Sequence, residues 1–80
     1  MNTLSHKIQD ITFEANIMVL TVNNQQIRIA LAEVSPKLNQ ASESVRNNFR
    51  ISTSGYGIHW PQIDEDLSLA GLLKKSGYKA

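Results

Sequence analysis

The chain has 80 residues, 41% of them hydrophobic and 19% charged, which fits one folded domain over residues 1–80 and leaves no room for a second. Lys and Arg number 8 against 7 Asp and Glu, and the formal net charge of +1 by itself indicates no polyanionic partner. The sequence has no cysteine, which excludes disulfides and thiol nucleophiles, and no apolar run approaches the ~20 residues of a membrane span, so we expect a cytoplasmic protein.

Three segments in the N-terminal part of the chain have the composition or the alternation of strands. They run from His6 to Phe13, from Ile17 to Val22 and from Ile27 to Leu31. Short polar breaks separate them, and the second break, Asn23-Asn24-Gln25, consists of residues that tolerate turn dihedrals. The pattern predicts an antiparallel three-strand meander.

Ser35-Pro36 is a helix-start signal, because serine offers an N-cap hydroxyl and proline is tolerated at the first helical position. An apolar stripe with helical spacing follows, formed by Leu38, Ala41, Val45 and Phe49. We predict one main helix that begins at Pro36, carries this stripe to Phe49 and lies on the sheet.

Two further strand-like segments, Arg50 to Thr53 and Ile58 to Trp60, flank a pair of glycines. Gly55 and Gly57 suit a tight turn, since glycine takes positive φ without steric cost. Pro61 marks the end of the second segment, because proline cannot donate to a strand ladder. The region predicts a second antiparallel hairpin.

The last part of the chain places three acids before four leucines: Asp64, Glu65, Asp66, Leu67, Leu69, Leu72 and Leu73. Carboxylates at a helix start satisfy free N–H groups and the positive dipole end, so we expect the acids to open a short C-terminal helix. Gly77 suits its end and leaves residues 78–80 as a tail. The predicted fold class is α+β, a small antiparallel sheet with one main helix and one short C-terminal helix.

His59 lies near the three acids, a combination that serves acid–base catalysis or binds a divalent metal. The spacing disfavours both uses, because a strand points His59 away from its neighbours and consecutive acids at a helix start point in different directions. The sequence also lacks the GxSxG pattern of serine hydrolases. We expect no enzyme activity, no metal and no cofactor.

Trp60, the only tryptophan, leaves two alternatives open. On the same side of its strand as Ile58 it fills the core, and its indole N–H then needs one acceptor. If it is exposed beside Tyr56, it forms a docking patch of the kind enriched at binding hot spots.

Basic residues are spread evenly along the sequence, and no basic run exceeds two residues. The chain has no GxxxxGK phosphate loop and no evident helix-turn-helix pair. The basic residues therefore fit a solvated surface better than a nucleic-acid interface, although a small nucleic-acid-binding regulator remains an alternative.

The run GYGIHWPQIDEDLSLAGLL resembles a bacterial family, the domain-of-unknown-function family numbered two-four-four-two. The resemblance extends to the strand before Leu31, to Ser35-Pro36-Lys37-Leu38 and to Arg50-Ile51, with departures at Ile63 and at Asn23-Asn24. It implies a small α+β domain, sometimes fused to helix-turn-helix domains and often encoded beside a predicted toxin. Matching motif positions without an assigned role are Gly55, Gly57, His59, Trp60, Pro61, Asp64, Asp66, Leu72 and Leu73.

These observations predict a non-enzymatic protein-interaction module, antitoxin-like or associated with a mobile element, that binds and modulates another protein. The candidate partner-binding residues are Tyr56, His59, Trp60, Asp64, Glu65 and Asp66, and the structural motif residues are Gly55, Gly57, Pro61, Leu72 and Leu73. We expect no membrane partner. An unpaired edge strand in so small a sheet also leaves a homodimer open.

Overall fold

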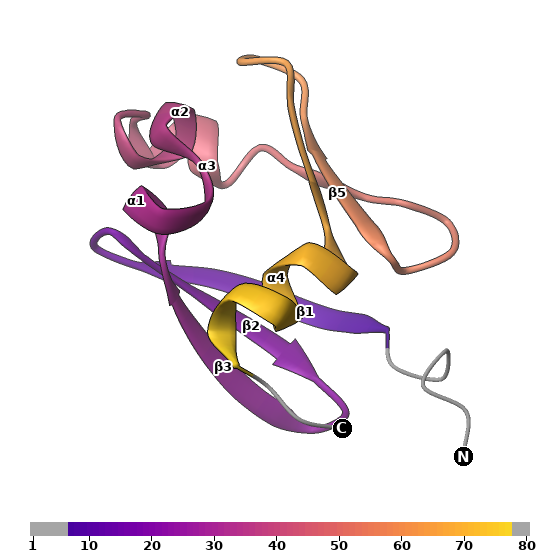
Figure 1. Cartoon of the computed structure of the whole chain (residues 1–80). Helices are drawn as coiled ribbons and strands as arrows, with labels where there is room; N and C mark the ends of the chain where they lie inside the picture. Colours follow the sequence, from indigo (N-terminus) through magenta and orange to yellow (C-terminus); the bar gives the residue numbers. More distant parts are fainter. Residues whose placement is uncertain (1–6, 78–80) are drawn as a thin grey trace.

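The computed structural model describes residues 7–77 (Figure 1). They form two antiparallel sheets of three strands each, together with short helices. One sheet has the strand order β1-β2-β3 and the other β4-β5-β6. The predicted α+β class, with an N-terminal meander and a C-terminal hairpin, is confirmed. The predicted strand start at His6 and the predicted tail 78–80 lie outside the described residues.

The first sheet is the predicted meander, made of β1 (Ile8–Glu14), β2 (Ile17–Val22) and β3 (Gln25–Ala30). A register shift between Ile8 and Asp10 marks a bulge, which lets Ile8 and Ile11 both face the core despite their uneven spacing. The second turn holds Asn23 and Asn24 at φ 54° and 64°, the left-handed conformation that two-residue hairpin turns favour.

The expected helix from Pro36 to Phe49 is wrong in its extent, because the region forms separate single-turn helices. These are α2 (Pro36–Asn39) and α3 (Glu43–Arg46), preceded by α1 (Leu31–Val34), where we had predicted the end of a strand. Ser35 caps α2 as predicted, by accepting from Leu38 N. Ser42 then takes an extended conformation and its hydroxyl accepts from Val45 N, so a second N-cap interrupts the helix.

The second sheet contains the predicted hairpin, formed by β4 (Arg50–Ile51) and β5 (Gly57–Trp60), and adds β6 (Glu65–Ser68). The prediction that Asp64, Glu65 and Asp66 open a helix is wrong. Asp64 closes a turn with φ 51°, and the next two acids pair with β5. Helix α4 (Leu69–Ser76) begins only after Ser68, whose hydroxyl accepts from Gly71 N, and it ends at Gly77 as predicted.

The core lies between the two sheets and is completed by side chains from the helices. Leu38 comes from α2, while Leu69 and Leu72 come from α4. Trp60 is fully buried in it and lies near the ring of Phe49, with ring centroids 6.2 Å apart. Within residues 7–77 no helix combines the length and apolar character needed to cross a membrane.

Candidate functional site

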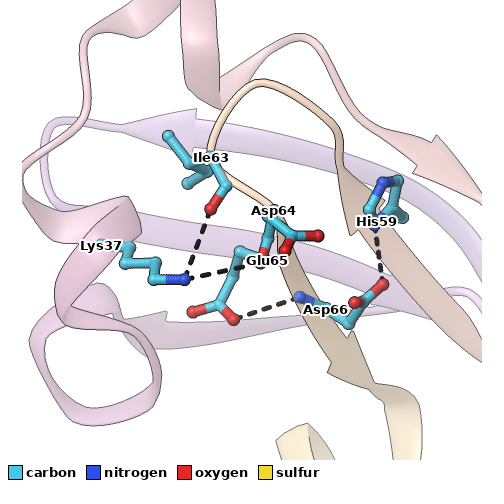
Figure 2. Close-up of polar contacts among 6 residues, drawn as sticks. All are labelled: Lys37, His59, Ile63, Asp64, Glu65 and Asp66. Atoms are coloured by element: carbon cyan, nitrogen blue, oxygen red, sulfur yellow. Dashed lines mark hydrogen bonds and ion pairs between the residues drawn. The ribbon is translucent and has the colours of Figure 1, made fainter.

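The predicted site residues divide between the two faces of the second sheet, because alternate residues of a strand point to opposite sides. Trp60 and Glu65, which are register partners, lie on the inner face, and His59 and Asp66 lie opposite each other on the outer face. Figure 2 shows this division, with the Glu65 carboxylate on the side of Lys37 and Asp66 directed toward His59.

Trp60 takes the core role of the two alternatives. The residue has no exposed surface, and its indole Nε1 donates to the carbonyl oxygen of Arg46 at 2.9 Å. Burial therefore overturns the prediction of Trp60 as a partner contact. Tyr56 is half-buried and packs against the core cluster, which groups it with Trp60 rather than with His59 and Asp66.

Glu65 connects the sheet to the cap of α2. The Ser35 hydroxyl, which is fully buried, donates to Glu65 Oε2, while Glu65 Oε1 accepts from Asp66 N at 3.1 Å. Lys37 Nζ donates to the carbonyl oxygens of Ile63 and Asp64 at 3.4 and 3.5 Å (Figure 2). These contacts give Glu65 a structural role and fix the turn that carries Asp64, whose side chain is exposed.

Arg46 is the structural residue that sequence reasoning missed. It is only 6% exposed, and its guanidinium donates to four acceptors: Leu38 O, Ala15 O, Asn39 O and Asn16 Oδ1. Because two of these carbonyls belong to α2 and two acceptors belong to the β1-β2 turn, Arg46 joins the first sheet to the helices. It is therefore not available to a nucleic acid.

The outer face carries a row of polar residues across the three strands. Arg50, His59 and Asp66 are aligned by the register of β4, β5 and β6. His59 Nδ1 lies 2.8 Å from Asp66 Oδ1, and the side chains are 42% and 73% exposed. Arg50 is exposed, and within the described part of the chain its guanidinium has no hydrogen-bond or ion-pair partner.

A hollow of about 450 Å³ lies beside this row. Small residues form the neighbouring row, with Ser52, Gly57 and Ser68 aligned across the strands. The hollow exists because Gly57 contributes no side chain at the centre of the sheet. Every residue that lines the hollow comes from this sheet or from Ser52 beside it, although Ile51, as the register partner of Ile58, has its side chain on the inner side.

The groups on the outer face suit recognition by ion pairs and hydrogen bonds. When His59 Nδ1–H donates to Asp66, Nε2 is left as an acceptor. The nearby hydroxyls are already engaged, since Ser52 Oγ accepts from Gly57 N and Ser68 Oγ from Gly71 N. Among residues 7–77 no three His, Cys, Asp or Glu side chains gather as ligands for a metal ion would.

The remaining motif residues hold the second sheet in place. Gly55 is buried at φ 83°, and its carbonyl oxygen accepts from Ile8 N at 3.0 Å, which ties the turn to β1. Pro61 is exposed at the start of the turn after β5. Leu72 is buried in the core, and Leu73 packs against it from the same helix.

The comparisons with known proteins place the chain by its sequence. A family described as "Protein of unknown function (DUF2442)" matches residues 8–78, which span β1 to α4. No curated protein and no solved structure matches the chain. The match covers nearly the whole length and includes the GYGIHWPQIDED block, so the resemblance seen in the sequence is confirmed. The chain belongs to the DUF2442 family.

Proposed function

We propose that this chain is a non-enzymatic protein-interaction module that binds a partner protein through the outer face of the second sheet. We define this outer face by Arg50, His59, Asp66, Ser52, Gly57 and Ser68. The observation that carries the proposal is the Arg50 guanidinium, which has no hydrogen-bond or ion-pair partner among residues 7–77 and lies in register with the His59–Asp66 pair. The hollow beside it is lined by this sheet and Ser52. Arginine is one of the residue types enriched at protein interfaces and among binding hot spots.

The outer face of the first sheet provides the internal contrast. There Arg28 on β3 forms an ion pair with Glu14 on β1. The register partner of Arg28 on the middle strand β2 is Val19, which is buried. The cation is thus neutralised within the chain, and the strand beneath it is covered. Arg50 lacks an equivalent carboxylate partner within residues 7–77. The outer faces of the two sheets therefore differ in whether they offer an arginine that has no carboxylate partner among the described residues.

The partner in this proposal is a cytoplasmic protein encoded by a neighbouring gene. An antitoxin-like role in a toxin–antitoxin or mobile-element system is the biological setting that the family resemblance favours. The chain would hold such a partner by its polar outer face and modulate it by covering part of its surface. The fold supplies rigid support on the inner side of the sheet, because Glu65 accepts from the Ser35 hydroxyl and Trp60 donates to the carbonyl oxygen of Arg46.

The test compares two variants that change the same residue type in the same way. The tagged chain is co-expressed with the product of the neighbouring gene, as wild type, as Asp66→Lys and as Asp10→Lys. Both positions are exposed on strands, one on the outer face of the second sheet and one on β1. The proposal expects co-purification with wild type and Asp10→Lys and its loss with Asp66→Lys. Equal retention by both folded variants would show that the partner binds elsewhere.

The two other classes of function make different predictions in the same system. A nucleic-acid regulator would bind DNA or RNA with an affinity that falls steeply as salt rises, and Asp66 would weaken rather than support that binding. A metal-dependent enzyme would purify with a metal ion that His59→Ala loses. Either result would replace the proposed function.

A further inference from the structure

We infer that the partner crosses the outer face with a carboxylate against Arg50 and a cation against Asp66, the two about 10 Å apart. This inference rests on the proposed function and specifies the chemistry of the partner. The charges at the two ends of the row have opposite signs, and the central His59 is already bonded to Asp66. The exposed guanidinium has no partner among residues 7–77 and is left to take a carboxylate of the partner protein.

The separation follows from the sheet register. Arg50, His59 and Asp66 occupy directly opposed positions on three adjacent strands. Neighbouring strands lie about 4.7 to 4.9 Å apart, so the two ends of the row are separated by roughly 10 Å. A helix that runs across the strands meets this spacing with charges about seven residues apart, since two such residues lie on one face of the helix and about 10 Å apart along its axis.

The middle of the face accepts a side chain from the partner. Gly57 leaves the hollow open, and a methyl group added there would lie 3.6 Å from its nearest neighbour, Ser52 Oγ, an ordinary contact distance. A residue between the two partner charges therefore has space to pack against the strands, which adds contact area to the ion pairs.

The sign pattern favours a protein over a nucleic acid. A phosphate backbone carries one charge at every nucleotide, so a polyanion that reaches Arg50 along the row also meets the Asp66 carboxylate. The Asp66 side chain is 73% exposed, so its negative charge is accessible to an approaching polyanion and repels it. A protein segment can present opposite charges at the two ends and avoid it.

The experiment selects random displayed peptides against the immobilised chain and measures the enriched peptides with charge-reversed proteins. The inference expects enriched peptides to carry an acid and a base at the helical spacing given above. Arg50→Glu should weaken them by about tenfold or more, and reversing the acid of the peptide should restore binding to that variant. Lys74→Glu, an exposed reversal on α4, serves as the control and should change binding by less than about threefold.

The outcomes separate the inference from the proposed function. Peptides that are lost when Gly57→Leu fills the hollow, but that lack the charge pair or ignore Arg50→Glu, overturn the inference and leave the outer face as the binding surface. If no peptide is enriched, or none depends on Gly57→Leu or Arg50→Glu, both fail. A labelled DNA duplex or RNA strand that binds in an Arg50-dependent manner overturns the protein assignment.

Discussion

Replacing Arg46 by methionine should destabilise the fold strongly, because the guanidinium joins parts of the chain that are distant in sequence. Methionine keeps much of the aliphatic volume and removes the four donated hydrogen bonds. The carbonyl oxygens of Ala15, Leu38 and Asn39 then lose a charged donor in a site where the arginine is only 6% exposed. Water has little access to replace that donor.

The magnitude follows from these bonds. Each buried acceptor that is left without a donor costs about 1 to 3 kcal/mol, whereas the Leu38 carbonyl oxygen keeps the N–H of Ala41 as a donor. Removing the guanidinium also recovers its desolvation cost, which offsets part of the loss, so we expect a net decrease of about 3 kcal/mol in the free energy of unfolding. A domain of this length is stable by roughly 4 to 12 kcal/mol, and the change is therefore a large fraction of the total.

Urea denaturation followed by the fluorescence of Trp60 measures this change, because the only tryptophan lies buried on the Arg46 carbonyl. Arg50→Met is the matched control, with the same substitution at an exposed arginine that has no partner among residues 7–77, and we expect it within about 0.5 kcal/mol of wild type. If Arg46→Met is as stable as Arg50→Met, the guanidinium does not hold the sheet and helices together.

Three further substitutions test the fold around the site by the same denaturation measurement. Gly55→Ala should cost about 1 to 3 kcal/mol, because φ is +83° and the new Cβ would lie 3.0 Å from a neighbouring side chain. The control Gly57→Ala should cost less than about 1 kcal/mol, and equal costs for the two variants would contradict the assigned turn. Ser35→Ala should cost about 1 to 3 kcal/mol, because it removes a buried cap and the donor to the half-buried Glu65 carboxylate. Ser42→Ala, which removes an exposed cap, should cost about 1 kcal/mol or less, and a larger cost for Ser42→Ala than for Ser35→Ala would refute the role of the buried hydroxyl. His59→Ala should change stability by less than about 1 kcal/mol, since its ion pair is exposed, and a larger loss would mean that the pair is structural.

Local chemistry made parts of the fold predictable. The alternation from Ile17 to Val22 gave the bounds of β2, since one face of that strand is buried throughout. Ser35-Pro36 gave the start of α2, because an N-cap and an N1 proline act within a single turn. Gly77 gave the end of α4 by its left-handed conformation.

The break between α2 and α3 depends on contacts that the sequence does not display. Arg46 reaches back to Ala15 and to the carbonyls at the end of α2, and no local pattern indicates that an arginine in an apparent helix will be buried. The signal that was present is Ser42, which can cap a new helix as readily as it can continue an old one.

The three acids were misread because carboxylates suit more than one local structure. Asp64 tolerates the left-handed conformation of a turn, and Asp66 suits the exposed face of an edge strand. In the structure Glu65 to Ser68 are half-buried and exposed in alternation, but in the sequence only Leu67 between Asp66 and Ser68 reflects this pattern, since Glu65 is itself charged. His59 and Asp66 lie opposite each other only because β6 pairs with β5, so this pair could not be predicted without β6.

The outer face was only partly predictable for the same reason. His59 and Asp66 were named from the sequence as candidates, but Arg50 joins them only through the pairing of three strands. Gly57 was read as a turn glycine, whereas it lies within β5 and opens the hollow. A glycine between strand-forming residues is itself a sign of close approach by another group.

Titration calorimetry of the neighbouring-gene product against the purified variants tests the outer face most directly. The account predicts that Asp66→Lys raises the dissociation constant by about tenfold or more. Asp10→Lys makes the same change of charge on the first sheet and should change the dissociation constant by less than about threefold. Equal dissociation constants for the two folded variants would contradict the account and place the binding surface elsewhere on the molecule.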